Sequence, residues 1–233
     1  MRVVCFTSDR TQWALQPFAY LFNLFWSSLQ VVDVAGYTVP PFRLPTNFRF
    51  TQIAPRPYPP QRFTDGVIEY LYNLTDDVFV LMFDDYWLCR GVDHQAIASL
   101  ADYLTMHPEV IRIDLTADRL YAGDMRDVES WGRLDIVETP ASSPYQMSTQ
   151  CCLVNRRNLL AIIKPGLTPW EFELQGNDML GDKYRVLGTR QYPVRYANGI
   201  GTGHGEDGWT EGIPLAQVAE MIARGYFPRK RPG

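Results

Sequence analysis

Short runs of consecutive apolar residues alternate with segments of helical periodicity along the first half of the chain. Residues 3–6 are all apolar, and residues 78–83 read Val-Phe-Val-Leu-Met-Phe. An unbroken apolar run is typical of a strand that is buried on both faces. Between these runs, apolar side chains recur at helical spacing in 17–26. The alternation predicts an α/β fold, with a mainly parallel mixed sheet flanked by helices in a single domain.

Capping residues and prolines suggest where the other elements begin and end. Thr64, Asp93 and Asn155 can each cap a helix, and these helices would end near residues 74, 107 and 163. Seven prolines between residues 40 and 60 predict an irregular surface loop. The polar stretch 118–147 is expected to be irregular apart from one strand. Further strands are expected at 31–34, 110–115, 134–137, 148–154, 184–187 and 194–197, and further helices at 169–180 and 214–224.

Composition narrows the class of protein. The net charge is −4 and the pI about 5.4, which argues against a protein that grips nucleic acid mainly through phosphates. The four cysteines, Cys5, Cys89, Cys151 and Cys152, lack zinc-ligand spacing and are expected to be reduced core thiols. Residues 11–32 carry no charge but contain several polar side chains, which favours a buried helix over a membrane span. We expect a cytoplasmic protein.

The strongest candidate chemistry lies directly after the six-residue apolar run. Asp84 and Asp85 emerge side by side from a buried strand, where two adjacent carboxylates repel each other and lose hydration. Mg²⁺ or Mn²⁺ would remove that cost, because these cations prefer carboxylates together with substrate phosphates. The alternative is that one aspartate caps a turn and the other faces solvent.

The run Val80-Leu81-Met82-Phe83-Asp84-Asp85-Tyr86-Trp87 resembles the strand and acidic motif of GT-A glycosyltransferases. Phe83 stands where many members carry a first acidic residue. Small phage and bacterial sugar transferases look similar, and the resemblance covers about residues 1–205. It implies that Asp85 binds the metal, and that Asp84 supports the metal or the donor ribose. It also implies that Thr7, Ser8 and Asp9, at the end of the first strand, meet the nucleotide of the donor.

A pair of glutamates provides the candidate catalytic carboxylate. The segment Trp170-Glu171-Phe172-Glu173 is similar to the helix start at which inverting members present their general base. Two residues apart on a helix, Glu171 and Glu173 point in different directions, so only one can face a pocket. We favour Glu173, then Glu171, with Asp178 a distant third. Flanking aromatic rings would raise the carboxylate's pKa. The alternative is an acidic first helical turn that interacts with the helix dipole.

A glycine-dense segment at 199–208 contains His204. Several GT-A enzymes supply a third metal ligand from a late histidine and close a flexible loop over the donor, and His204 resembles that ligand. The alternative is a solvent-exposed loop histidine. The glycine spacing matches neither a dinucleotide fingerprint nor a phosphate-binding loop.

The expected activity is metal-dependent transfer of a sugar, with inversion, from a nucleotide-diphosphate sugar to a hydroxyl acceptor. UDP-sugar is the default donor by resemblance. Residues 1–115 would form the nucleotide-binding half and 116–212 the acceptor and catalytic half, followed by a C-terminal helix and tail at 213–233. One rival is a nucleotidyl or phosphosugar transferase with the same metal site, and another is an inactive glycan- or nucleotide-binding module. A retaining mechanism, the acceptor (a modified DNA base, a glycan or a small molecule) and the oligomeric state stay open.

Overall fold

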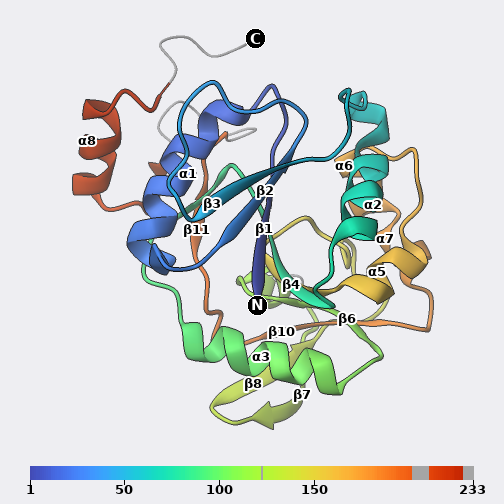
Figure 1. Cartoon of the computed structure of the whole chain (residues 1–233). Helices are drawn as coiled ribbons and strands as arrows, with labels where there is room; N and C mark the ends of the chain where they lie inside the picture. The colour runs from blue at the N-terminus through green and yellow to red at the C-terminus, as the bar shows by residue number, and fades with distance from the viewer. Residues whose placement is uncertain (122, 201–209, 228–233) are drawn as a thin grey trace. The chain divides into compact units, whose positions relative to one another are not determined.

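A computed structural model (Figure 1) describes residues 1–121, 123–200 and 210–227. The contacts divide the chain into two interleaved compact units. Unit 1 contains Met1–Arg2, Ile53–Leu81 and Asp93–Pro193, and unit 2 contains Val3–Gln52, Met82–Val92 and Val194–Gly233. Each unit takes segments from both expected halves, 1–115 and 116–212. The assignment of one half to the nucleotide and the other to the acceptor stays a prediction.

Unit 2 contains three parallel strands in the order β3-β2-β1. Val3, Val4 and Cys5 are fully buried, as expected for a strand enclosed on both faces. The helix that follows β1 is rich in aromatic residues, and rings from α1 pack edge-on against Phe48 of β3. These elements are β1 (Arg2–Phe6), η1 (Gln12–Ala14), α1 (Leu15–Phe22), the π-helical turn η2 (Asn23–Ser27), β2 (Val32–Gly36) and β3 (Phe48–Gln52).

The remaining elements of unit 2 include a second, two-stranded sheet. β5 (Tyr86–Leu88) pairs antiparallel with β11 (Tyr196–Asn198), and Tyr86 stacks on Tyr196 with ring centroids 4.2 Å apart. The expected C-terminal helix is α8 (Leu215–Ala223). Gly225 lies just beyond the C-cap Arg224, and its φ of 69° is readily adopted by glycine.

Unit 1 contains a mixed sheet in the order β4-β9-β6-β10-β8-β7. β9 runs antiparallel to both of its neighbours, whereas β6 and β10 are parallel. β4 begins in unit 1 and passes into unit 2 between Leu81 and Met82. The strands are β4 (Val78–Phe83), β6 (Val110–Asp114), β7 (Arg126–Trp131), β8 (Leu134–Glu138), β9 (Cys152–Asn155) and β10 (Arg185–Thr189).

Helices flank the sheet of unit 1. α3 and α5 both contact β6 and β9, and α2, α5, α6 and α7 form one connected group (Figure 1). The expected caps at Asp93 and Asn155 are confirmed, because their side chains accept from the backbone N–H groups of Ala96 and Asn158. The helices are η3 (Pro60–Arg62), α2 (Phe63–Asn73), α3 (His94–Met106), α4 (Asp118–Tyr121), α5 (Arg156–Ile162), α6 (Pro169–Leu174) and α7 (Gly176–Leu180).

The expected fold class, α/β with a mixed sheet flanked by helices, is confirmed. All four cysteines are buried and free of disulfides, as predicted. None of the helices in the described part of the chain has the length and apolar character needed to span a bilayer.

Some local expectations were wrong. Thr64 does not cap α2: the N-cap is Arg62, and the buried Thr64 hydroxyl accepts from Leu167 N–H at 3.0 Å. The proline-rich segment contains strand β3, and the stretch 118–147 contains α4 and β7 in addition to β8. The strand expected at 148–154 begins only at Cys152.

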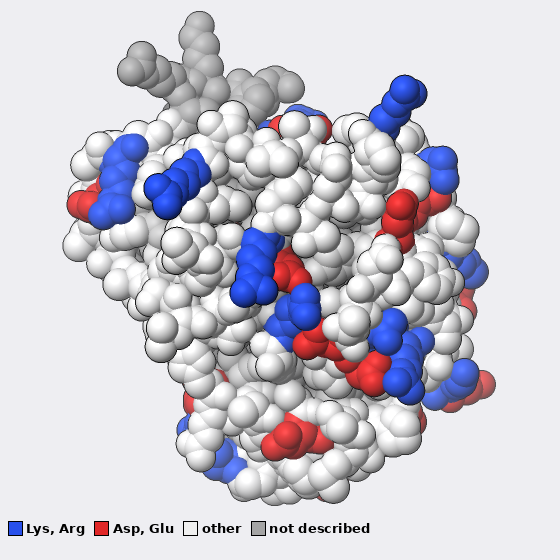
Figure 2. Space-filling model, viewed as in Figure 1, with Lys and Arg blue, Asp and Glu red and all other residues white. Residues whose placement is uncertain are grey.

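Charges on the surface are mixed in sign. Within unit 1, Arg2 pairs with Asp76, and Asp77 pairs with both Arg156 and Arg157. Basic and acidic side chains are likewise interspersed on the face drawn in Figure 2.

Candidate active site

The site lies in unit 2, where β4 ends beside the end of β1. The Asp84 N–H donates to Phe6 O at 3.2 Å, which joins the two strand ends. The buried Asp84 Oδ2 accepts from Thr7 Oγ1 at 2.6 Å and from Thr11 Oγ1 at 2.7 Å. Two hydroxyl groups from the segment after β1 therefore fix the orientation of this carboxylate.

Both aspartates have raised pKa values. Burial is the main cause of the raised pKa of Asp84 and the charge of Asp85 adds to it, while the Thr7 and Thr11 hydroxyls act in the opposite direction. Burial raises the pKa of the half-buried Asp85 to about 6. At neutral pH the pair thus carries charge that its surroundings disfavour. A bound cation would relieve this cost.

The backbone of the Asp84–Asp85 turn is held in place by Trp87 and Gly199. Trp87 is fully buried, and its indole N–H lies 3.1 Å from Asp84 O. Asp85 O accepts from Gly199 N–H at 2.7 Å. A Cβ atom on Gly199 would lie 2.2 Å from Trp87 Cε2, so no larger residue fits here without movement. The strand β11 therefore ends against this turn.

The three residues expected at the nucleotide differ in their surroundings, and of these Thr7 bonds directly to Asp84. The exposed Ser8 hydroxyl lies 2.9 Å from Thr11 Oγ1. The carboxylate of Asp9 accepts from Thr38 N–H at 3.1 Å and from Thr38 Oγ1 at 2.7 Å. Asp9 thus ties the loop after β1 to the segment after β2. Nucleotide contact by Thr7, Ser8 and Asp9 stays a prediction.

The acidic pair fits a hard cation only if substrate and water supply the remaining ligands. No group of three or more His, Cys, Asp or Glu side chains that could hold a metal occurs within 1–121, 123–200 and 210–227. Asp84 and Asp85 supply two carboxylates, and Mg²⁺ or Mn²⁺ commonly completes such a set with substrate phosphates and water. His204, the expected third ligand, lies outside the described residues.

Glu171 is part of a helix cap in unit 1. Its side chain accepts from the Thr168 N–H at 2.8 Å, and Thr168 Oγ1 accepts from the Glu171 N–H, which completes a capping box. These hydrogen bonds lower the pKa of Glu171. Trp170 is 66% exposed and gives no apolar enclosure. The expectation that flanking rings raise this carboxylate's pKa was wrong.

Glu173 is held by a residue that the sequence did not identify. The half-buried carboxylate accepts from Thr149 N–H at 2.5 Å and from Thr149 Oγ1 at 2.7 Å, both at Oε1. Oε2 accepts no hydrogen bond from the residues that the structure describes. Thr149 therefore fixes one of the two carboxylate oxygens. Asp178 is exposed on α7. Glu171 and Glu173 belong to unit 1, and Asp84 and Asp85 to unit 2.

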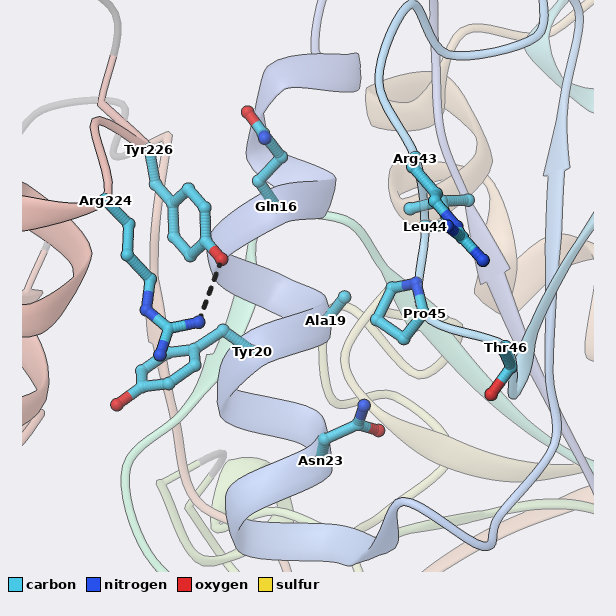
Figure 3. Close-up of a pocket in the computed structure, with 10 residues that line it drawn as sticks. All are labelled: Gln16, Ala19, Tyr20, Asn23, Arg43, Leu44, Pro45, Thr46, Arg224 and Tyr226. Atoms are coloured by element: carbon cyan, nitrogen blue, oxygen red, sulfur yellow. Dashed lines mark hydrogen bonds between the residues drawn. The ribbon is translucent and has the colours of Figure 1, made fainter.

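A pocket of about 450 Å³ lies elsewhere in unit 2. Figure 3 shows α1 crossing it, with Arg43 to Thr46 on one side and Arg224 and Tyr226 on the other. The Arg224 guanidinium lies 5.0 Å from the centre of the Tyr20 ring. None of the predicted site residues that the structure describes lines this pocket.

No protein-family model matches the chain, and no curated protein matches it. Among solved structures, the chain is similar to CMP:2-keto-3-deoxy-manno-octonic acid synthetase bound to CTP, with 13% identity, a TM-score of 0.43 and coverage of 96% of this chain and 99% of that one. It is also similar to apo UDP-glucose pyrophosphorylase, with 11% identity, a TM-score of 0.42 and coverage of 96% of this chain and 100% of that one. A third similar structure is Mycobacterium tuberculosis glucosyl-3-phosphoglycerate synthase in complex with Mn²⁺, UDP and glucosyl-3-phosphoglycerate. Its identity is 12% and its TM-score 0.41, and the match covers 98% of this chain and 81% of that one. These structures are of enzymes named for, or bound to, nucleotides and nucleotide sugars. With TM-scores below 0.5, none determines this chain's own reaction.

Proposed function

We propose that the chain is a metal-dependent glycosyltransferase, which moves a sugar from a nucleotide-diphosphate sugar to a hydroxyl acceptor with inversion. The observation that carries the proposal is the Asp84–Asp85 pair. Its carboxylates stand at the meeting ends of β1 and β4, one oriented by Thr7 and Thr11 and both with raised pKa values. In α/β sheets, ligands gather at the carboxyl ends of strands.

The residues of unit 2 would bind the donor. Asp85 would hold Mn²⁺ or Mg²⁺, Asp84 would support the cation or the ribose, and the segment Thr7 to Asp9 would meet the nucleotide, by default UDP. The cation, when bound, neutralises charge on the departing diphosphate. His204 is a candidate third ligand.

Glu173 of unit 1 would act on the acceptor. Thr149 fixes Oε1, so Oε2 would take the proton of the acceptor hydroxyl. In the same step the acceptor oxygen would bond to the anomeric carbon of the donor sugar. The bond from that carbon to the diphosphate oxygen breaks in the same step, and the electron pair leaves with the nucleoside diphosphate. A carboxylate base of this kind contributes about 10²–10⁴-fold in rate.

The test combines calorimetric titration of UDP-sugars with a transfer assay, each with and without Mn²⁺. Asp85→Asn should lose Mn²⁺-dependent donor binding by about 100-fold or more. Glu173→Gln should bind donor normally and lose transfer by about 10²–10⁴-fold. Asp102→Asn, on an exposed position of α3, is the control and should change neither. His204→Ala in the same titration tests the third ligand.

Other outcomes point elsewhere. Unchanged Mn²⁺-dependent affinity in Asp85→Asn would remove the metal assignment. Release of pyrophosphate from a nucleoside triphosphate and a sugar phosphate would identify a nucleotidyltransferase. Donor binding without any turnover would identify a binding module.

A further inference from the structure

A loop in unit 1 presents an aromatic side chain from an unfavourable backbone conformation. Tyr145 has φ of 58°, in the left-handed region that favours glycine and asparagine. A tyrosine at such a position is kept only where the surroundings impose it. The loop around Tyr145 should therefore be held firmly, and two sets of contacts hold it.

A buried ion cluster holds the loop from the inside. Asp114 is fully buried between Arg112 and Arg119, with Arg119 Nε 2.6 Å from Asp114 Oδ2. The Arg119 guanidinium also donates to Tyr145 O at 3.0 Å and to Gln146 Oε1 at 2.9 Å. The cluster thus fixes the carbonyl of the strained residue itself.

Helix α7 holds the same loop from another direction. The Asn177 side-chain amide donates to Ala141 O at 2.9 Å and to Ser143 O at 2.7 Å. At Gly176, an added Cβ would lie 2.6 Å from the Cβ of Met147, so the loop is packed directly on the backbone of α7. These contacts leave the loop little room to relax.

The ring of Tyr145 is not needed for this packing. It is 49% exposed, and its hydroxyl and ring make no hydrogen bond or ring contact with the described residues. Glycine or asparagine would satisfy the same backbone at lower cost. An aromatic ring presented at the surface by a firmly held backbone, where a smaller residue would serve the fold better, points to a use in binding.

We propose that Tyr145 is a stacking platform for a carbohydrate ring of the acceptor, which rests on the function proposed above. A tyrosine combines a flat apolar face with a polar hydroxyl, and this matches the C–H face and hydroxyl rim of a pyranose. The site is in unit 1, whereas the donor nucleotide is assigned to unit 2. The proposed base, Glu173, also belongs to unit 1, so we assign the platform to a sugar of the acceptor.

The platform is close in sequence to the proposed base. Tyr145 and Thr149 are four residues apart, so their Cα atoms are at most about 14 Å apart. Thr149 in turn fixes Glu173. The platform thus belongs to the same short segment of unit 1 as the threonine that orients the proposed base.

The experiment is saturation-transfer NMR on the full chain without any donor. The probes are the methyl α- and β-pyranosides of glucose, galactose and mannose. Wild type should give saturation transfer with at least one probe. Tyr145→Asn, which suits the backbone but removes the ring, should weaken that binding by about tenfold or more, the scale of one aromatic stacking contact. Tyr145→Phe should retain binding within about threefold.

The control is Tyr72→Asn, at a 70% exposed tyrosine on α2 of the same unit, and it should bind as wild type does. Tyr145→Asn should also melt no lower than wild type, because its backbone strain is relieved. Equal binding by Tyr145→Asn and wild type, no saturation transfer with any probe, or a clearly lower melting temperature in Tyr145→Asn would each overturn the proposal. The measurement uses neither Mn²⁺ nor nucleotide, so its result is independent of the Asp85 test.

Discussion

Asp84 and Asp85 are adjacent in the chain but are stabilised differently. Asp84 is buried and receives two threonine hydroxyl bonds, which favour its charged form against burial and against its neighbour. Asp85 is half-buried, and burial raises its pKa to about 6. The charged pair therefore lowers the free energy of unfolding when no cation is bound, and removing one charge should raise it.

We expect Asp85→Asn to stabilise the metal-free protein at pH 7.5. A carboxyl whose pKa is about 6 when folded, against about 3.9 when unfolded, holds its proton longer in the folded state. The free energy of unfolding therefore falls as pH rises from about 4 to 6, and the whole penalty is present above pH 6. Allowing for partial exposure, the neutral variant should be about 1–2 kcal/mol more stable at pH 7.5.

Urea unfolding at pH 4 and pH 7.5 would measure this difference, with and without Mn²⁺. At pH 4 the variant and wild type should have the same free energy of unfolding. Mn²⁺ should stabilise wild type at pH 7.5 and leave Asp85→Asn unchanged. An Asp85→Asn protein less stable than wild type at pH 7.5 without metal would show that the Asp85 carboxylate is a structural group.

Only part of the candidate site could be predicted from the sequence. Asp84, Asp85 and Thr7 follow apolar runs, so the rule that ligands gather at strand ends identifies them. Thr11 and Thr149 could not be found this way, because they act on carboxylates 73 and 24 residues away in the chain. Nothing local in the sequence marks such a pairing. The capping box of Thr168 and Glu171 follows a local sequence pattern that can be recognised without a structure. It favours the structural interpretation of Glu171.

At the scale of elements, the sequence predicted the buried strands and missed exposed or very short ones. β1 and β4 are apolar throughout or nearly so, and β6 contributes Val110, Ile111 and Ile113. The bounds of all three strands agree with expectation to within about a residue. β7 is exposed at most positions and has no apolar face to reveal it. β3 lies between prolines, and its pairing with β2 outweighs that local signal. Pairing partners are tertiary information, which periodicity does not carry.

The junction of β5 and β11 gives an element-scale prediction. Gly199 belongs to the glycine-dense segment, and the absence of a side chain lets its backbone pack directly against Trp87. Gly199→Ala would place a methyl group 2.2 Å from Trp87 Cε2. Either the buried indole moves or the Gly199 N–H bond to Asp85 O breaks. We expect a loss of about 1–3 kcal/mol in the free energy of unfolding.

Gly91→Ala is the matched control, because a Cβ there meets no atom within 4 Å. Thermal melts of both variants would test the prediction. Gly199→Ala should melt several degrees below Gly91→Ala, with weakened Mn²⁺-dependent donor binding, since Asp85 is part of the same turn. Equal melting temperatures would show that the β5–β11 junction can adjust without cost.

At the scale of the whole molecule, the proposed roles divide between the two units. The acidic pair and the loop after β1 belong to unit 2, and Glu173 and the Tyr145 loop belong to unit 1. β4 runs from unit 1 into unit 2, and its last residue precedes Asp84. Donor and acceptor binding can therefore be followed separately in one chain, by the segments that each ligand protects.

Hydrogen exchange should show this division. With UDP and Mn²⁺ at 100 times the dissociation constant, segments of unit 2 that exchange by opening to a form without ligand should slow by up to about 100-fold, since binding then stabilises them by about 2.7 kcal/mol. The peptides to follow contain Ser8 to Thr11 and Asp84 to Leu88. Peptides around Tyr145 and Thr149 should slow less with UDP and more with a bound methyl pyranoside. In Asp85→Asn the UDP effect should vanish while the pyranoside effect persists, because only the first depends on the metal. Protection by UDP confined to unit 1, or an unchanged UDP effect in Asp85→Asn, would reverse the assignment of the donor to unit 2.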